Sequence, residues 1–450
     1  MMSASATTHL ILGLGETGLS VAEYLLAQQQ PFRVMDTRSE PPGVAQLNTL
    51  SPNTPVHCGG WHDAWLAEAE HLYLSPGLPL AEPRIQNAIA RGVQLHNDID
   101  LYLQTTTAEV IAVTGTNGKS TVVHLLEYLA RQLGLSAMAG GNIGYPALKL
   151  LSQPHDWAIL ELSSFQLELV QCLQARVSMI LNISPDHLDR YPNLAAYKAA
   201  KQRIFRGAQA WVYHQDDTSS YPDQALEGPM QGYALDRIAP DLLSMVHQPP
   251  YWHLYLGTQC VYTWSQPPIV GRHNQLNALA ALAAGHLCGW DLSQMAAALS
   301  TYQGLPHRTE WVARIQDVTF INDSKGTNVG ATLAAIDGLM PQCLGRFHLL
   351  LGGQDKGAEF SPLWQRCKEL GIQLYAFGES APGWHQHNAA MEVFPTLDAA
   401  FAEVLCRVAP NDWVVLSPAG ASFDQYSGYP ARGNHFKQLV QQWQRMEASS

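Results

Sequence analysis

The segment Thr114-Gly-Thr-Asn-Gly-Lys-Ser120 joins an apolar run at Glu109–Val113 to a helical pattern that begins at Thr121. Backbone N–H groups in a glycine-containing loop between a strand and a helix can cradle phosphate groups. The ammonium of Lys119 would add a positive charge there, and the hydroxyl of Ser120 could reach Mg²⁺. Val113 stands where the usual phosphate loop has its first glycine. The segment nevertheless predicts a nucleotide phosphate site made by Gly115, Thr116, Asn117, Gly118, Lys119, Ser120 and Thr121.

A second glycine-containing turn lies near the start of the chain, at Gly13-Leu-Gly-Glu-Thr-Gly18. It follows an apolar run and precedes a helical pattern, which is the setting in which a helix N-terminus binds phosphate. Asp36-Thr37 ends the next apolar run, about 20 residues after the middle glycine, where a ribose-binding acid is expected. The pattern predicts a nucleotide site without saying which nucleotide, and a tight turn without a ligand is the alternative.

Acidic and histidine side chains follow two further apolar runs. Glu161 ends the run that begins at Trp157, and His187 lies in the segment Asn182-Ile-Ser-Pro-Asp-His-Leu-Asp189. In open α/β sheets ligands bind beyond the carboxyl ends of the strands, so these groups could converge on the phosphate loop. A glutamate is a typical Mg²⁺ ligand, whereas a histidine is an unusual one. Without its neighbours, His187 would be interpreted as an exposed turn residue.

Basic residues are rare in this chain, 26 of 450, so their positions carry information. Lys198 and Lys201 share one face of a predicted helix, and their spacing alone favours a solvated surface pair. Arg308, Lys325 and Lys356 each lie in a loop beside a predicted strand end in the last third of the chain. Together these loops predict anionic ligands there.

The elements that must position these residues form three α/β blocks. Alternation of apolar runs with helical patterns predicts parallel sheets. The predicted strands are His9–Gly15, Phe32–Asp36, His71–Ser75, Glu109–Val113, Trp157–Glu161, Val177–Ile183, Val318–Asn322, Phe347–Leu351, Leu374–Phe377 and Trp413–Leu416. The predicted helices are Leu19–Ala27, Ser120–Leu133, Leu194–Phe205 and Asn274–Leu287. Residues 214–250 are expected to form loops, and Tyr251–Trp264 a β-hairpin around Gly257-Thr258.

Composition excludes several classes of protein. The formal net charge of −12 argues against a general nucleic-acid binder and against binding to an anionic membrane. Hydrophobic residues make up 46% of the chain and charged residues 14%, which is typical of a globular protein. We expect neither a membrane-spanning helix nor a signal peptide. Seven scattered cysteines without a C-x-x-C pair predict reduced thiols, a cytoplasmic location and no structural zinc site.

Taken together and in this order, the motifs resemble those of the Mur ligase family of ATP-dependent amide-forming enzymes, in its D-glutamate-adding branch. The motifs are GLGETGLS, VMDTR, SPGLP, GTNGKS, GGNIG, ELSSFQLE, NISPDHLDRY, YKAAK, GRHNQLNALAA, GLPHR, INDSKGTN, LLLGGQDKG and LSPAGASFDQ. The resemblance implies a Rossmann-like UDP-binding domain over 1–97, a central P-loop ATPase-like domain over 98–304 and a Rossmann-like domain over 305–450. It implies peptidoglycan synthesis through an acyl-phosphate intermediate, with ATP and two Mg²⁺ ions.

The resemblance also implies residue roles. For the UDP-linked substrate it implies Gly15, Glu16, Thr17, Asp36, Thr37, Ser75, Pro76, Gly77, Asn142 and His187. For ATP it adds to the phosphate loop Asn277 near adenine, Asp323 on ribose and Arg308 on phosphates. The implied catalytic residues are Lys119, Glu161, His187, Lys201 and Arg308, with Ser120, Glu161, His187 and a carbamylated Lys201 as metal ligands. For D-glutamate it implies Thr327, Lys356, Ser422, Phe423 and, in place of a family phenylalanine, Tyr429.

Three alternatives remain open at this level. An NAD-dependent dehydrogenase would use the first glycine turn but leaves the phosphate loop and the last third of the chain unexplained. A nucleotide-gated binding protein without catalysis would not need Glu161, His187 and Lys201 together. Another ligase of the same family would take a different acceptor amino acid. We expect small-molecule substrates, a monomer, no nucleic-acid partner and no insertion into a membrane.

Overall fold

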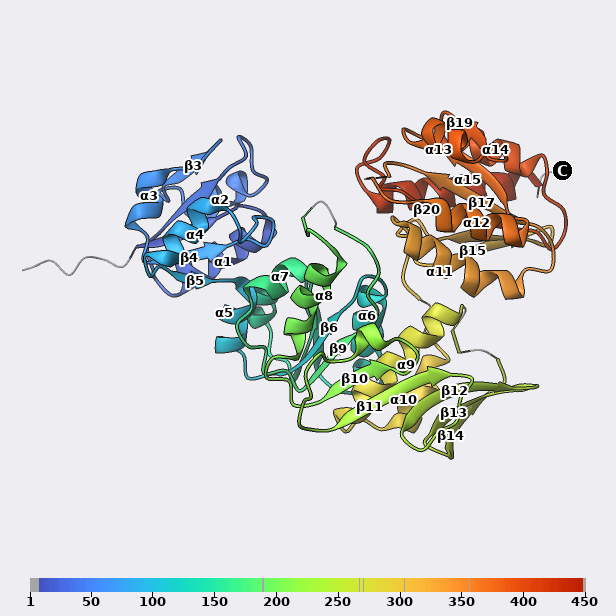
Figure 1. Ribbon diagram of the computed structural model, residues 1–450, viewed down its shortest axis with the longest axis horizontal. Helices are drawn as coiled ribbons and strands as arrows, with labels where there is room; N and C mark the ends of the chain where they lie inside the picture. Colours follow the sequence, from blue (N-terminus) through green and yellow to red (C-terminus); the bar gives the residue numbers. More distant parts are fainter. Residues whose placement is uncertain are drawn as a thin grey trace, which may run out of the picture. The chain divides into compact units, whose positions relative to one another are not determined.

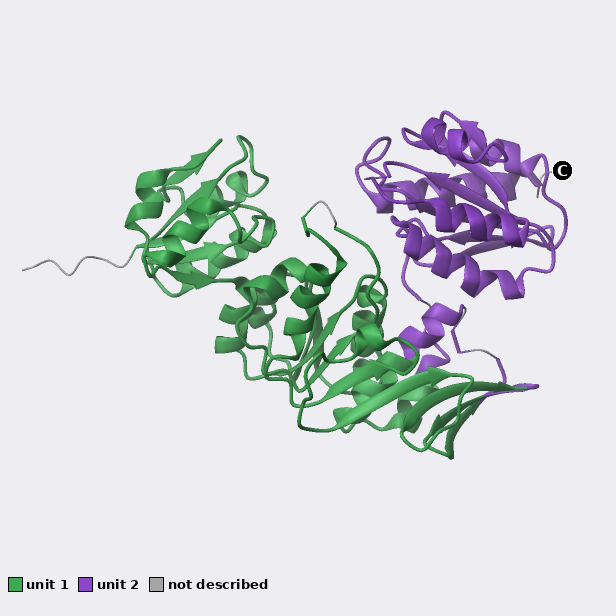
Figure 2. Ribbon diagram, in the orientation of Figure 1, with its two compact units in different colours: residues 1–248, 253–263, 279–298 green, residues 249–252, 264–278, 299–450 purple. Residues whose placement is uncertain are grey.

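The computed structural model describes residues 8–187, 190–266, 268–269, 271–302, 304–355 and 357–447. The chain divides into two compact units, the first made of residues 1–248, 253–263 and 279–298 and the second of the remainder (Figure 2). Within the described residues, three separate β-sheets lie along the chain (Figure 1). This arrangement confirms the predicted α/β class and the three blocks.

The first sheet has five parallel strands in the order β3-β2-β1-β4-β5. Alternate residues of β1 pack into opposite faces, because Ile11 belongs to one hydrophobic cluster while Leu10 and Leu12 belong to another. The elements are β1 His9–Leu12, α1 Glu16–Ala27, β2 Phe32–Asp36, α2 Val44–Leu50, β3 Val56–Cys58, α3 Asp63–Glu68, β4 His71–Leu74, α4 Pro83–Ala90, β5 Gln94–His96 and α5 Asp98–Thr105. The sheet is thus covered on both faces, as parallel sheets usually are.

A cluster of stacked rings lies on one face of this sheet. His71 stacks on His9 and on His96, with ring centroids 4.8 and 5.0 Å apart. Nδ1 of His71 is 2.8 Å from Nε2 of His96, and Tyr73 contributes its hydroxyl to His9 Nδ1 at 2.9 Å. Burial, followed by the charge that His71 and His9 would carry, lowers the pKa of His96 to about 4. His96 therefore stays neutral at neutral pH.

The second sheet has nine strands in the order β14-β13-β12-β11-β10-β9-β6-β8-β7, with β6 third from the β7 edge. The pairs from β12 through to β7 are parallel. Its strands are β6 Glu109–Thr114, β7 Ala137–Gly141, β8 Trp157–Glu161, β9 Val177–Ile180, β10 Trp211–His214, β11 Met230–Leu235, β12 Leu242–Gln248, β13 Tyr251–Leu256 and β14 Gln259–Trp264. Its helices are α6 Lys119–Gln132, α7 Ser164–Leu169, α8 Leu194–Gln202, α9 Arg272–Leu287 and α10 Leu292–Leu299.

The third sheet has six strands in the order β15-β16-β20-β17-β18-β19. All its pairs are parallel except that of the edge strand β15, which is antiparallel to β16 and has a bulge between Trp311 and Ala313. The strands are β15 Glu310–Ile315, β16 Val318–Asn322, β17 Phe347–Gly352, β18 Gln373–Phe377, β19 Glu392–Phe394 and β20 Trp413–Ala419. The helices are α11 Val329–Leu339, α12 Ser361–Leu370, α13 Ala381–His387, α14 Leu397–Leu405 and α15 Tyr429–Glu447.

All ten predicted strands are present with shifts of a few residues at their ends, and the hairpin over 251–264 is confirmed as β13 and β14. One prediction is wrong. Residues 214–250 are not all loop, since they contain β11 and β12. Polar and proline residues around these two strands hid them, while their inward residues, such as Tyr233 and Leu243, are buried. In the part of the chain that the structure describes, no helix has the length and apolar character needed to cross a membrane.

Candidate active site

The phosphate loop connects β6 to α6 at the carboxyl edge of the second sheet. Gly118 adopts φ +86°, a left-handed conformation that allows the chain to turn into the first residue of α6. The loop is fixed to the segment after β9, because Thr116 N donates to Asn182 O and Asn117 N donates to Asn182 Oδ1, both at 2.9 Å. The first turn of α6 therefore presents its N–H groups from a loop of fixed shape.

Lys119 folds back over this loop. Its Nζ donates to the carbonyl oxygens of Gly115 and Thr116, each at 2.7 Å. The ammonium thus lies at the loop where the sequence predicts phosphate groups. The neighbouring Ser120 and Thr121 are buried at the start of α6.

Lys201 lies against the same loop from α8. Its side chain is only 1% exposed, and its Nζ donates to Gly115 O at 2.9 Å and to Thr114 Oγ1 at 3.2 Å. Burial, with the nearby charge of Lys119 as a second cause, lowers the pKa of Lys201 well below that of a solvated lysine. Lys198 instead points outward and pairs with Asp223 at 2.6 Å. The two lysines are therefore not the surface pair that spacing alone favoured, and that interpretation is wrong for Lys201.

Glu161 is the last residue of β8 and is 3% exposed. Its Oε1 accepts from Asn142 Nδ2 at 2.9 Å, and its Oε2 has no hydrogen-bond partner among the described residues. Gly141, at φ +100°, packs so closely that a Cβ there would collide with the Glu161 carbonyl oxygen. Asn142 N donates to that same carbonyl at 2.8 Å. A buried carboxylate oxygen without a partner is costly, and this one is available for a ligand.

His187 follows β9 in a left-handed conformation, at φ +53°. Its ring packs edge-on against Phe165, with centroids 4.9 Å apart, and its Nε2 is 3.8 Å from Asp186 Oδ2. The side chain is 43% exposed. His187 therefore presents one side to solvent.

The glycine turn of the first sheet is built by close backbone packing. A Cβ on Gly18 would collide with the Gly13 carbonyl oxygen, and Ser75 Oγ donates to that oxygen at 3.0 Å. Gly15 is the N-cap of α1 and uses no side chain to satisfy the N–H groups of the first turn, where Glu16 and Thr17 lie. Those N–H groups are thus left for water or a ligand.

Asp36 is already engaged by the protein. Its carboxylate accepts from Leu14 N at 2.7 Å and from Arg38 N, Nε and NH2 at 2.8, 3.0 and 2.6 Å. Burial by itself would raise the pKa of Asp36, but these bonds outweigh it and hold the pKa below its usual value. The carboxylate fixes the glycine turn to the end of β2, beside Thr37.

Sequence reasoning missed Arg190. Its guanidinium donates to Pro76 O at 2.9 Å and to Leu78 O at 3.2 Å, and it lies 4.0 Å above the ring of Phe165. It thus connects the Ser75–Leu78 loop to α7, which carries Phe165. The sequence gives no signal for this role beyond the rarity of arginine.

In the second unit, Asp323 lies just beyond β16 and is fully enclosed. Its Oδ1 accepts from Thr309 N at 3.0 Å and its Oδ2 from Ser417 Oγ at 2.7 Å. Burial raises its pKa to about 6 in spite of these bonds. The residue connects the strand ends of β16 and β20 with the segment that contains Arg308.

The other predicted residues of this unit lie on nearby loops and on α9. Asn277 is buried on α9, and Ser422 is buried after β20, whereas Phe423 is 68% exposed. Thr327 precedes α11, and the ring of Tyr429 lies 4.1 Å from Lys325 Nζ at the start of α15. Lys356 falls outside the described residues, so its predicted contact with an acceptor stays a prediction.

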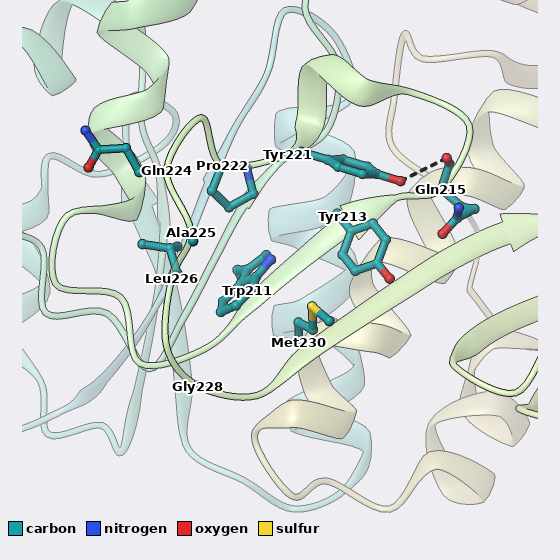
Figure 3. A pocket seen from close by; sticks show the side chains of 10 residues that line it. All are labelled: Trp211, Tyr213, Gln215, Tyr221, Pro222, Gln224, Ala225, Leu226, Gly228 and Met230. Atoms are coloured by element: carbon teal, nitrogen blue, oxygen red, sulfur yellow. Dashed lines mark hydrogen bonds between the residues drawn. The ribbon is translucent and has the colours of Figure 1, made fainter.

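The structure also contains a cavity of about 510 Å³ beside β10 and β11, lined by Trp211, Tyr213 and Tyr221 among others (Figure 3). None of the predicted site residues lines it. Among the described residues, no group of three or more histidine, cysteine, aspartate or glutamate side chains is arranged to hold a metal ion. Any metal would therefore need oxygen atoms from substrates or water in addition to Ser120 and Glu161.

Family models match most of the chain. They are the Mur ligase MurD-like N-terminal domain over residues 7–97, the Mur ligase middle domain over 113–285 and the Mur ligase glutamate ligase domain over 307–420. The chain belongs to the Mur ligase family. Its phosphate loop, Glu161 and Lys201 lie in the middle-domain match, and Arg308, Asp323 and Thr327 lie in the glutamate ligase domain match.

Relatives agree with this family, and solved structures share its fold. The UDP-N-acetylmuramoylalanine–D-glutamate ligase of Nitrosococcus oceani is 44% identical, with 97% of each chain covered. The ligase of the same name from Marinobacter nauticus is 41% identical, with 96% of this chain and 97% of the other covered. A pseudomurein peptide ligase type C from Methanothermus fervidus has a TM-score of 0.61 at 16% identity, covering 97% of this chain and 100% of the other. MurF from Acinetobacter baumannii has a TM-score of 0.61 at 17% identity, covering 98% and 92%. The solved structures support the three-domain fold.

Proposed function

We propose that this chain is an ATP-dependent ligase that joins D-glutamate to UDP-N-acetylmuramoyl-L-alanine during peptidoglycan synthesis. The observation that carries the proposal is that relatives of this name are 39–44% identical over almost their whole length. The phosphate loop with Lys119 and Lys201 beside it supports the nucleotide step. A dehydrogenase would leave this loop without a role.

The reaction needs activation because a carboxylate is a poor electrophile. The substrate carboxylate attacks the γ-phosphorus of ATP, which releases ADP and forms an acyl phosphate. The amine of D-glutamate then attacks the acyl carbon, the C–O bond to phosphate breaks, and the amine loses a proton. The products are an amide, ADP and phosphate. Positive charge near the transferred phosphoryl group lowers the barrier for the first step.

In this scheme the N–H groups of Gly115–Gly118 and the first turn of α6 bind the phosphates. The ammonium of Lys119 gives up its hydrogen bonds to the two loop carbonyls and donates to phosphate oxygens instead. Arg308 adds a second positive charge for the phosphates. Asn277 and Asp323 are assigned to adenine and ribose. The carboxylate of Asp323 is enclosed and already accepts hydrogen bonds from Thr309 N and Ser417 Oγ. It can accept a hydrogen bond from a ribose hydroxyl only at an oxygen that one of these two donors also uses.

The residues present fit Mg²⁺. Glu161 Oε2 is buried and unpartnered within the described residues, and Ser120 lies in the first turn of α6 beside the phosphate loop. When bound, Mg²⁺ neutralises phosphate charge and orients the oxygens for transfer. We assign Glu161 and Ser120 to one ion, and His187 with Lys201 to a second.

Lys201 suits a second ion only as a carbamate. Its amine would attack CO₂, form an N–C bond and release a proton to solvent, so that a cation becomes an anion. The protein leaves this nitrogen bonded to two neutral oxygens, Thr114 Oγ1 and Gly115 O, and an ammonium there would repel a divalent ion.

The first domain is assigned to the UDP group, through the turn at Gly15–Thr17, the pair Asp36 and Thr37, and the Ser75–Gly77 loop. Asp36 acts chiefly by shaping the turn, because its carboxylate already accepts protein donors. Asn142 and His187 would contact the sugar-peptide. Thr327, Lys356, Ser422, Phe423 and Tyr429 are assigned to D-glutamate.

We further propose domain limits of 1–97, 98–304 and 305–450, a monomer, and a cytoplasmic location. Limited proteolysis tests the domain limits, sedimentation tests the monomer, and fractionation of cells tests the location.

The function is tested by ADP release with UDP-N-acetylmuramoyl-L-alanine present and D-glutamate, L-glutamate, L-alanine or meso-diaminopimelate as acceptor. We expect stoichiometric ADP with D-glutamate alone and a product heavier than the substrate by one glutamyl residue. Turnover with another amino acid would reject the assigned acceptor. A change in nicotinamide absorbance without ADP release would reject the ligase.

A further inference from the structure

Arg432 is a completely buried arginine in the first turn of α15, with 0% of its surface exposed. Arginine is almost never fully buried unless it is paired, because removing its charge from water is costly. No ion pair with a carboxylate is found for it among the described residues. Neither the phosphate loop nor the residues so far assigned to substrates explain it.

Its guanidinium connects three loops at the carboxyl edge of the third sheet. Nε and NH2 donate to Ser324 Oγ and O, at 3.1 and 2.9 Å, just beyond β16. NH1 donates to Gly352 O at the end of β17 and to Gly420 O just after β20, at 3.0 and 3.1 Å. All four acceptors are uncharged, so the positive charge is solvated by protein dipoles but not neutralised.

The loops above it are tightly joined. Gln354 N donates to Ala421 O and Ala421 N donates to Gln354 O, both at 2.8 Å. Gly353, at φ +112°, allows this approach, since a Cβ there would collide with Ala421 O and lie 3.1 Å from Arg432 NH1. Ser422 follows immediately in the chain, so the guanidinium lies beneath a loop assigned to the acceptor.

The guanidinium of Arg432 keeps its positive charge at neutral pH. Burial lowers the pKa of Arg432 to about 10, against the longer-range attraction of Asp424 and Asp323. A buried charge acts through a low dielectric and is felt more strongly than a surface one. The carboxyl ends of parallel strands are also where ligands of such sheets bind.

We propose that Arg432 is a positioning and specificity-determining residue for the acceptor, which holds the three loops together and provides the positive potential that favours an anionic amino acid. The proposal rests on the proposed function for the identity of that amino acid. It adds a second, buried source of positive charge beyond the loop lysine predicted from the sequence.

The test compares Arg432→Met, which removes the charge but keeps the length, with Arg432→Lys, which keeps the charge but cannot bridge three loops. Arg445→Met, on the exposed last turn of the same helix, is the matched control. For each variant we would measure KM for D-glutamate, D-glutamine and ATP by ADP release, and thermal unfolding by circular dichroism.

For Arg432→Met we expect KM for D-glutamate to rise at least tenfold, with KM for ATP within twofold of wild type. Preference for D-glutamate over D-glutamine should fall by a similar factor. For Arg432→Lys we expect weaker binding of both amino acids with the preference retained. Arg445→Met should behave as wild type.

A merely structural role would move thermal stability, or all three KM values in parallel, and leave the D-glutamate to D-glutamine ratio unchanged, which overturns the proposal. If Arg432→Met does not fold, loss of the preference in Arg432→Lys overturns it equally. Failure of the proposed function is separate, because it appears as wild type using another acceptor. The same comparison would then be made with that amino acid and its neutral analogue.

Discussion

Replacing Lys201 by alanine should abolish most activity without unfolding the protein, whereas replacing Lys198 should do little. The Lys198–Asp223 ion pair is exposed, with 33% and 53% of the two side chains accessible. Such pairs contribute about 0.2–1 kcal/mol, which corresponds to less than about a fivefold change in any equilibrium constant. The two lysines are the same residue type on the same helix, so a difference in activity between their variants tests the effect of burial and position.

For Lys201 we expect a small effect on stability and a large effect on catalysis. Loss of its bonds to Thr114 Oγ1 and Gly115 O would cost about 1 kcal/mol each, and removal of a desolvated amine would offset much of that. We therefore expect the thermal midpoint of Lys201→Met to lie within a few degrees of wild type. Loss of one charged group that stabilises the transition state typically lowers kcat by about 10²–10³-fold, or roughly 3–4 kcal/mol.

The assay is kcat from ADP release for Lys201→Ala, Lys201→Met and Lys198→Ala, together with thermal unfolding. Equilibration with ¹³C-bicarbonate should give a carbamate carbon signal in wild type and in Lys198→Ala but not in the Lys201 variants. Equal kcat values for Lys201→Ala and Lys198→Ala would refute the reasoning. A carbamate signal that persists in Lys201→Met would place the modification elsewhere.

Three further outcomes follow from the described contacts. Lys119→Ala should reduce turnover to background while the far-ultraviolet spectrum stays that of wild type, since the bonds of its Nζ to the carbonyls of Gly115 and Thr116 contribute only about 1 kcal/mol each; ADP release near the wild-type rate would reject the phosphate-loop assignment. Gly141→Ala should lower kcat much more than Gly144→Ala, because both positions have positive φ but a Cβ collides with the Glu161 carbonyl only at Gly141; equal losses would mean that backbone strain alone is responsible. The pKa of His96 is lowered to about 4, so the neutral ring should contribute stability above pH 6.5 that is lost as the pH falls towards 4, because the unfolded chain takes up the proton first. In urea unfolding at pH 7.5 and 5.0, the free energy of unfolding should therefore decrease less for His96→Phe than for wild type.

Periodicity and turn chemistry were enough to predict the parallel strands and the loops at their carboxyl ends. These signals are local and indicated only that Glu161 and the phosphate loop could converge, whereas the structure places them on neighbouring strands of one sheet. β11 and β12 were missed because their inward residues are interrupted by small and polar ones such as Gly232 and Ser244. The burial of their inward residues, which no local pattern reveals, determines that these two segments form strands.

The residues that sequence reasoning missed are those whose role depends on distant segments. Arg190 reaches the Ser75–Leu78 loop more than a hundred residues away, and Arg432 reaches three separate strand ends. Lys201 was preferred to Lys198 only through resemblance to a family, because two lysines on one helical face are indistinguishable by spacing. Long-range contacts of single side chains leave no period in a sequence.

The antiparallel edge strand of the third sheet has a consequence for behaviour in concentrated solution. An exposed strand edge is a template on which a second chain can add a strand and begin aggregation. On β15 the bulge between Trp311 and Ala313 interrupts the regular register, and bulges also increase the local twist. The charges of Glu310 and Arg314 on the same short strand further disfavour edge-to-edge pairing. β15 thus ends the sheet and leaves it a poor surface for growth, even though Trp311 is 53% exposed on it.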